Sequence, residues 1–175
     1  MREKTPSREE CLRMLRENYV PPHIIAHSEA VADVALELGR EMKKNGERVN
    51  LRLLDAGALL HDISKFASLG KHETEISHGE TGAKLLRKLG FPWIAEIAQA
   101  HMFSSIFTEG ALDTWEKKLV YYADKRVNHD RRVKLDSRIA YLSRRYPKGA
   151  RMFREARPLL KELEKELFSK ARMKI

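Results

Sequence analysis

The sequence predicts an all-α protein of about seven or eight helices. Apolar residues recur at the three-to-four-residue spacing of amphipathic helices through most of the 175 residues. No segment shows the sustained alternation of apolar and polar residues that indicates strands. With 42% apolar residues, a chain of this length can bury about 70% of the surface that its unfolded form exposes, which fits one compact domain.

Two helices are predicted before residue 46. Ser7 can cap a helix over residues 8–18, which the segment VPPH then interrupts. Pro22 can occupy the first turn of a long helix that ends near Asn45-Gly46, because a first-turn N–H has no partner within the helix. The apolar spacing predicts that this long helix buries a face that contains Val31, Val34, Ala35 and Leu38.

Capping residues indicate the next two helices. Asn50 is a suitable N-cap for a helix over residues 51–66. Ser77 is expected to cap the following helix, with Glu80 three residues later in the register of a capping box. Gly90 is expected to end that helix.

Four further helices complete the prediction. Pro92 opens the first of them, and a second starts at Asp113 and continues to about residue 130. Asp136 begins a third, which Pro147 stops. An amphipathic helix is expected over most of residues 150–170.

The composition limits the class of protein. No apolar run approaches the ~20 residues of a membrane span, and the first residues lack the apolar region of a signal peptide. The lone cysteine, Cys11, cannot form an internal disulfide or a thiolate metal site. We therefore expect a cytoplasmic protein with no membrane partner.

Positive charge is concentrated at the C-terminal end. The net charge is +9, but residues 1–124 hold 17 Lys/Arg against 19 Asp/Glu, whereas residues 125–175 hold 17 against 6. Such an excess is expected either of a solvated helical face or of a surface that attracts a phosphate-bearing substrate or nucleic acid. Charge alone does not separate the two.

Histidines and aspartates fall on helical faces that are predicted to point inward. Burying an unpaired carboxylate costs several kcal/mol, so cores avoid it unless the charge is paired or bound to metal. Imidazole and carboxylate ligands together suit divalent first-row metals, and without thiolate ligands a structural zinc site is not expected. The adjacent pair His61-Asp62 would chelate one metal or join two. The residues concerned are His27, His61, Asp62, His78, His101 and Asp124.

These residues and their surroundings resemble the HD-domain superfamily of metal-dependent phosphohydrolases. The family order is a histidine, an adjacent His-Asp pair and a distant aspartate, which correspond here to His27, His61-Asp62 in LLHDISK and Asp124 in YYADKRV. Many members have two more histidines between the pair and the last aspartate. HGETGA and IAQAHMF resemble those segments, with His78 preferred over His72 for the first. Ser64 stands where the family motif usually has glycine.

The resemblance implies a fold, a domain layout and a metal centre. The fold would be an HD-domain helical bundle with its metal-binding core over residues 21–130. Residues 1–20 would form a helix packed on that core, and 131–175 basic helices of the same compact unit. His27, His61, Asp62 and Asp124 would hold one divalent ion, and Asp62 would bridge to a second held by His78 and His101. The resemblance leaves open one or two ions of Fe, Mn, Ni, Co, Zn or Mg.

The activity implied is hydrolysis of a phosphoester or phosphoanhydride by metal-activated water. Asp62 and Lys65 would be catalytic, and Lys65, Lys125 and Arg126 would contact the substrate phosphate; a surface role for Lys65 is equally open. The six-ligand pattern resembles hydrolases of diadenosine tetraphosphate, so a nucleotide or dinucleotide is the expected substrate. Three alternatives remain: a diiron HD-type oxygenase, an HD nuclease acting on nucleic acid, and a nucleic-acid-binding module that uses the basic C-terminal region. A homodimer is left open.

Overall fold

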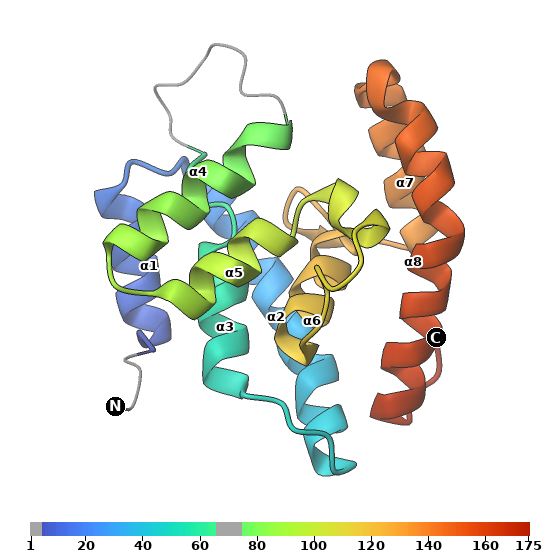
Figure 1. The fold of residues 1–175 in the computed structure, drawn as a ribbon, viewed down its shortest axis with the longest axis horizontal. Coiled ribbons are helices and arrows are strands. Elements are labelled where there is room, and N and C mark those ends of the chain that lie inside the picture. Colours follow the sequence, from blue (N-terminus) through green and yellow to red (C-terminus); the bar gives the residue numbers. More distant parts are fainter. Residues whose placement is uncertain (1–4, 66–74) are drawn as a thin grey trace.

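The computed structural model describes residues 5–65 and 75–175, and helices dominate this part of the chain (Figure 1). Eight α-helices, two short 3-10 helices and one antiparallel hairpin are present in the described residues, which confirms the all-α fold class. In chain order the elements are α1 (Arg8–Glu17), α2 (Pro22–Lys44), α3 (Leu51–Leu60), α4 (Glu75–Lys88), α5 (Pro92–Ala100), η1 (Phe103–Phe107), α6 (Trp115–Asp124), β1 (Val127–Asn128), β2 (Arg131–Arg132), α7 (Leu135–Arg145), η2 (Pro147–Gly149) and α8 (Ala150–Ala171).

The predicted helix starts are confirmed at the N-terminal end of the chain. Ser7 accepts a hydrogen bond from the Glu10 backbone N–H, and the Glu10 side chain accepts one from the Ser7 N–H, which completes a capping box. Pro22 is the first residue of α2. The Asn50 side chain accepts from the Leu53 N–H and caps α3.

Other predicted helix bounds are wrong. α3 ends at Leu60 instead of continuing to residue 66. α4 already includes Glu75, so Ser77 lies inside the helix and is not its cap; serine and glycine in a first turn do not prevent a helix that packs on α5. α6 stops at Asp124, and the hairpin β1–β2 takes the place of the last residues predicted to be helical. Strands of two residues are too short to produce a period-two pattern, so this hairpin leaves no signal in the sequence.

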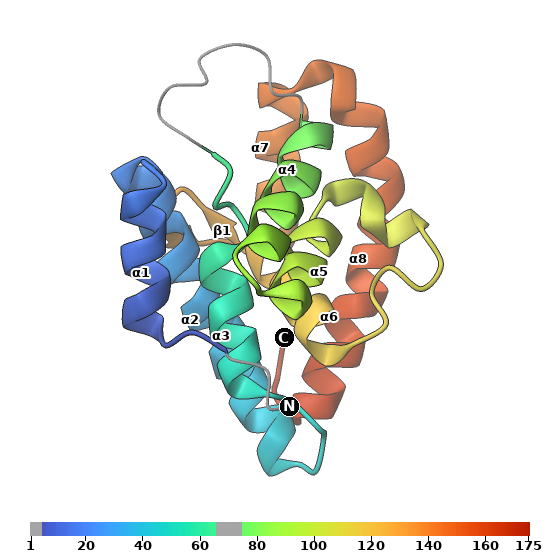
Figure 2. The same cartoon turned by 60° about the vertical axis from the view of Figure 1, so that its left-hand side comes forward.

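α2 lies at the centre of the bundle and packs against α3, α6 and α8. The pair α4 and α5 covers one side of the molecule and the pair α7 and α8 the other, as Figure 1 shows. In the turned view of Figure 2, α1 lies beside α3. This arrangement brings together the N-terminal end of α2 and the C-terminal ends of α3, α5 and α6.

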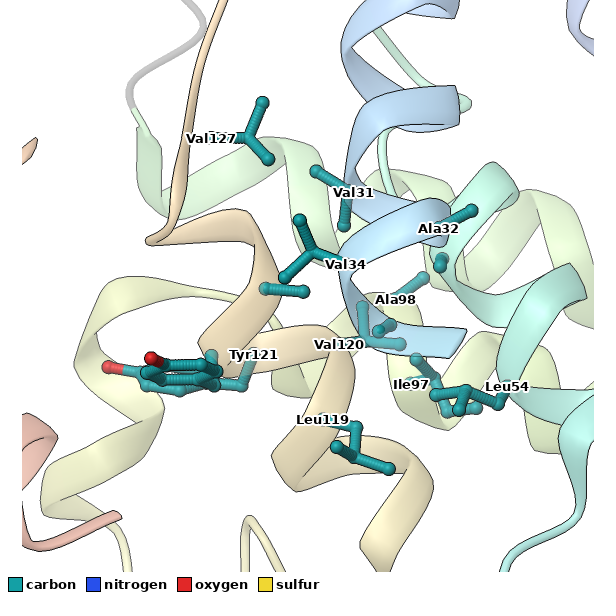
Figure 3. Close-up of a cluster of buried hydrophobic side chains, with 14 of the residues drawn as sticks. Val31, Ala32, Val34, Leu54, Ile97, Ala98, Leu119, Val120, Tyr121 and Val127 are labelled. Atoms are coloured by element: carbon teal, nitrogen blue, oxygen red, sulfur yellow. The ribbon is translucent and has the colours of Figure 1, made fainter. Parts of the chain in front are cut away.

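The core is continuous through the bundle. Val31 and Val34 of α2 meet Val120 of α6 in the cluster that Figure 3 shows, with Ile97 of α5 close by. The same cluster also contains Cys11 of α1 and, from α8, Phe153, Leu160 and Leu167. Burial of these side chains is the main force that fixes the relative positions of the helices. Within the described residues, no helix has the length and apolarity needed to cross a bilayer.

Candidate metal centre

Six polar side chains from five segments meet where the helix ends converge. Asp124 is the last residue of α6, and His27 lies in the second turn of α2. His61 and Asp62 directly follow α3. His78 lies near the start of α4 and His101 is the C-cap of α5, and both are buried.

One group of ligand atoms surrounds the first candidate metal position. His27 Nε2 lies 3.0 Å from Asp124 Oδ1, and His61 Nε2 lies 3.9 Å from the same oxygen. Asp62 Oδ2 is 3.3 Å from His61 Nε2. Ligand atoms of His27, His61 and Asp62 all lie within 4.8 Å of one another, so a single ion could contact all three.

A second group uses the other oxygen of the same aspartate. Asp62 Oδ1 lies 3.5 Å from His78 Nε2 and 3.4 Å from His101 Nε2. The two ring nitrogens are 3.0 Å apart. Asp62 therefore directs one carboxylate oxygen to each group, which is the arrangement of a carboxylate that bridges two metal ions.

Backbone carbonyls fix the orientation of three of the imidazoles. The Nδ1 atom of His27 lies 2.7 Å from the carbonyl oxygen of His129, that of His61 2.7 Å from Ala58 O, and that of His101 2.5 Å from Ala98 O. A carbonyl oxygen can only accept, so each Nδ1 carries the hydrogen. In a neutral ring the lone pair then lies on Nε2, and all three Nε2 atoms face the carboxylates. Such a backbone hydrogen bond is typical of histidines that ligate a metal.

Two polar atoms at the centre of the site have no hydrogen-bond partner among the described residues. They are His61 Nε2 and Asp62 Oδ1, and both are buried. Lone pairs of imidazole and carboxylate that face one another without a hydrogen or a cation between them repel. Leaving such groups unsatisfied costs free energy, and a divalent cation would remove that cost at both atoms. The residues present therefore fit a metal ion.

Comparison with known families agrees with this geometry. The family model of the HD domain matches residues 24–128, which is more than half of the chain and includes all six candidate ligands. The chain belongs to the HD domain family. The buried His/Asp groups of this HD-domain protein fit the divalent metal binding that the family suggests.

This HD-domain protein is similar to proteins of three organisms. An uncharacterized protein of Methanocaldococcus jannaschii is 33% identical over 153 residues, which cover 81% of this chain and 87% of the relative. Two proteins named tRNA (cytidine(56)-2'-O)-methyltransferase, from Thermoplasma volcanium and Picrophilus torridus, are each 30% identical over 142 residues. That match covers 74% of this chain but 39% of each methyltransferase. No solved structure matches the chain.

The charges of the HD-domain site favour bound cations. Burial raises the pKa of Asp62, but His61 and Lys65 outweigh that effect and hold the pKa well below its usual range. Burial lowers the pKa of His61, yet the carboxylates of Asp62 and Asp124 raise it overall. Burial lowers the pKa of His78 to about 3, so this ring stays neutral and keeps a lone pair for a ligand. The carboxylates are thus ionised and attract positive charge.

Two glycines and one serine allow close contacts between the helices that carry the candidate ligands. A Cβ on Gly57 of α3 would lie 2.7 Å from Ile97 Cδ1 of α5, and a Cβ on Gly79 of α4 would lie 2.5 Å from Met102 Cγ. Ser64 Oγ donates a 2.7 Å hydrogen bond to the carbonyl oxygen of His78. Ser64, which stands where the family usually has glycine, therefore ties the turn after α3 to α4.

A cavity of about 60 Å³ opens beside the candidate ligands. Lys65 and Lys125, two of the predicted substrate contacts, lie on its wall. Lys65 Nζ is 2.8 Å from Asp62 Oδ2, and Lys125 Nζ is 2.9 Å from Asp124 Oδ2. Arg138 of α7, which was not predicted from the sequence, also lines this cavity. No motif marks Arg138, because its position depends on how α7 is rotated against the HD core.

The structure does not bring Arg126 to the cavity. Its Nε donates to the carbonyl oxygen of Val133, and its Nη1 contacts the Tyr122 hydroxyl and, at 3.1 Å, Glu164 Oε1. The guanidinium thus joins α6 to α8, and its position does not support the predicted phosphate contact. His72, the alternative to His78, lies outside the described residues.

Proposed function

We propose that this HD-domain protein is a metal-dependent phosphohydrolase that cleaves a phosphoester or phosphoanhydride, with a nucleotide as the preferred substrate class. One observation carries the proposal. Asp62 directs one oxygen to each of two groups of imidazole nitrogens, and its neighbours form the wall of a cavity that cationic side chains line.

The chain's own residues have distinct tasks in such a reaction. His27, His61, Asp62 and Asp124 would hold one divalent ion, and Asp62, His78 and His101 a second. The chemistry that bound divalent cations supply is a water of lowered pKa as nucleophile and positive charge beside the phosphoryl oxygens. Lys65 and Lys125 keep the two carboxylates ionised and place ammonium groups on the cavity wall.

The form of the cavity favours a substrate that inserts only its phosphoryl group. A space of about 60 Å³ is closer to the size of a phosphoryl group than to that of a whole nucleotide. The remainder of the substrate would therefore lie outside the cavity, where the contacts that select one nucleotide over another would be made.

The test is anaerobic purification and metal analysis, followed by assays on a panel of mononucleotides, dinucleoside polyphosphates and generic phosphoesters with Mn, Fe, Co, Ni and Mg. Release of phosphate or nucleotide by the wild-type protein and its loss in His61→Ala are expected. Dioxygen consumption by the iron-loaded protein, without phosphate release from any substrate, would instead favour the HD-type oxygenase.

A phosphoester of RNA is a second candidate substrate. Residues 125–175 hold 17 Lys/Arg against 6 Asp/Glu. Within the described residues, Arg132 beside α7 pairs with Glu37, but no carboxylate forms an ion pair with six other cations on or next to this helix, namely Arg131, Lys134, Arg138, Arg144, Arg145 and Lys148. Two relatives also carry the name of a tRNA methyltransferase. These observations favour an extended polyanion on the α7 side of the cavity.

RNA binding can be tested separately from hydrolysis. We expect transfer RNA to bind with an affinity that falls steeply with salt, and the variant Arg144→Gln/Arg145→Gln/Lys148→Gln to bind more weakly with a shallower salt dependence. Lys44→Gln/Lys165→Gln/Lys170→Gln is a matched control that removes the same number of charges, because all three lysines already pair with glutamates. Equal effects of the two variants would rule out a specific role for α7.

A further inference from the structure

We infer that Arg138 is a substrate-binding residue that contacts the phosphate group inside the cavity. This inference rests on the proposed function, since it assigns the anion of that same site a specific partner. The sequence motif does not include Arg138, which lies on α7 beyond the residues that the HD family model matches.

The position of α7 makes Arg138 part of the cavity wall. Arg138 and Leu142, one helical turn apart, both line the cavity together with the candidate ligands His27 and Asp124. α7 packs on α8, and α8 packs in turn on α2 and α6, so the core of the bundle holds this wall in place. The apolar anchors of α7 in that core are Leu135, Ile139 and Leu142.

Neighbouring side chains orient the guanidinium. Nη1 of Arg138 donates a 2.7 Å hydrogen bond to Asn128 Oδ1 of β1. The Tyr141 ring lies with its centroid 5.6 Å from Arg138 Cζ. Nε of Arg138 is buried and has no hydrogen-bond partner among the described residues. A buried donor without an acceptor is costly, and a turn of the guanidinium toward a phosphate in the cavity would give Nε an acceptor.

The charges around the cavity point to an anion as the missing partner. The described residues of its wall include three cationic side chains and one aspartate, Asp124, while Asp62 lies directly behind. Lys65 and Lys125 each contact one of these aspartates, whereas Arg138 contacts no carboxylate among the described residues. Bound divalent ions would make the cavity still more positive. A planar guanidinium with several donors matches a phosphate, which it can bind through two parallel hydrogen bonds.

The experiment is a calorimetric titration of the metal-loaded protein with inorganic phosphate. We expect Arg138→Met to bind phosphate about 10- to 100-fold more weakly than wild type, as loss of hydrogen bonds to a charged group predicts. Arg154→Met is the matched control, because it removes the same charge from an exposed position on α8. Its phosphate affinity should stay within about twofold of wild type.

Two further variants keep the test decisive if Arg138→Met folds poorly. Arg138→Lys retains the charge but loses the second donor, so its phosphate affinity should fall between those of wild type and Arg138→Met. Asn128→Ala removes the hydrogen bond that orients the guanidinium and should weaken phosphate binding without changing the metal content. Unchanged phosphate affinity in all of these variants, or an equal loss in Arg154→Met, would overturn the inference.

Failure of this inference can be told from failure of the proposed function. Phosphate binding that depends on Arg138, in a protein that hydrolyses no phosphoester, would support the anion contact and contradict the hydrolase. Hydrolysis with an unchanged KM and unchanged phosphate affinity in Arg138→Met would support the hydrolase and contradict the anion contact.

Discussion

The rings of His61 and His101 lie with centroids 4.8 Å apart and planes at 75°, and both residues are C-caps, of α3 and α5. Each Nδ1 donates to the carbonyl oxygen three residues earlier, on Ala58 and on Ala98. The carbonyls at the end of a helix lack partners within the helix, so each histidine both closes its helix and acquires a fixed orientation. Two helix ends thus aim their imidazoles at one point.

This relationship predicts the tautomers of three histidines. In the zinc-loaded protein, His27, His61 and His101 should all carry hydrogen on Nδ1 and ligate through Nε2. Long-range ¹H–¹⁵N NMR correlation spectra distinguish the two tautomers directly. Hydrogen on Nε2 of any of these rings in the loaded protein would contradict the geometry described above.

The hydrogen bond from Ser64 to His78 should support the second metal position more than the first. Ser64→Ala removes the 2.7 Å contact that ties the turn after Asp62 to α4, so the affinity for the second ion should fall about 10-fold. Isothermal titration with metal measures both affinities. Ser28→Ala is the control, because Ser28 is equally buried but its hydroxyl has no hydrogen-bond partner in the part of the chain that the structure describes. A similar loss in both variants would argue against this role for Ser64.

Gly57 should be required for the packing of α3 on α5. In Gly57→Ala the new methyl group would lie 2.7 Å from Ile97, so the free energy of unfolding should fall by about 1–3 kcal/mol. Gly82→Ala in α4 is the matched control, since its Cβ would meet neighbours at 3.5 Å or more. Alanine there should leave stability unchanged or raise it by up to about 1 kcal/mol. Urea denaturation monitored by circular dichroism gives both values, and the opposite order would contradict the packing.

Arg126 should contribute to stability and not to substrate binding. Arg126→Met removes the guanidinium 3.1 Å from buried Glu164, but Lys161 and Tyr122 still contact that carboxylate, so the free energy of unfolding should fall by about 1.5–3 kcal/mol. The KM for the substrate identified in the phosphoester panel should change less than twofold. A raised KM with unchanged stability would instead support the phosphate contact that the sequence predicts for Arg126.

The sequence was enough to predict the candidate ligands, because histidines and aspartates are unusual on buried helical faces and follow the distinctive order of the HD family. It placed His61 within a continuing helix, whereas the residue ends α3, because the hydrogen bond from its own ring to Ala58 is not visible in a helical pattern. Arg138 was missed for a different reason. Its role depends on the hairpin that supplies Asn128 and on the rotation of α7, and a two-residue strand carries no periodic signal.

The central claim is that Asp62 joins two metal positions, and the metal content per chain tests it most directly. Elemental analysis of anaerobically purified protein should give two equivalents of divalent metal for the wild type and one for His78→Ala/His101→Ala. The double variant keeps all ligands of the first position, so its fold and its first ion should be retained. Equal metal content in the two proteins, at either one or two equivalents, would contradict the account.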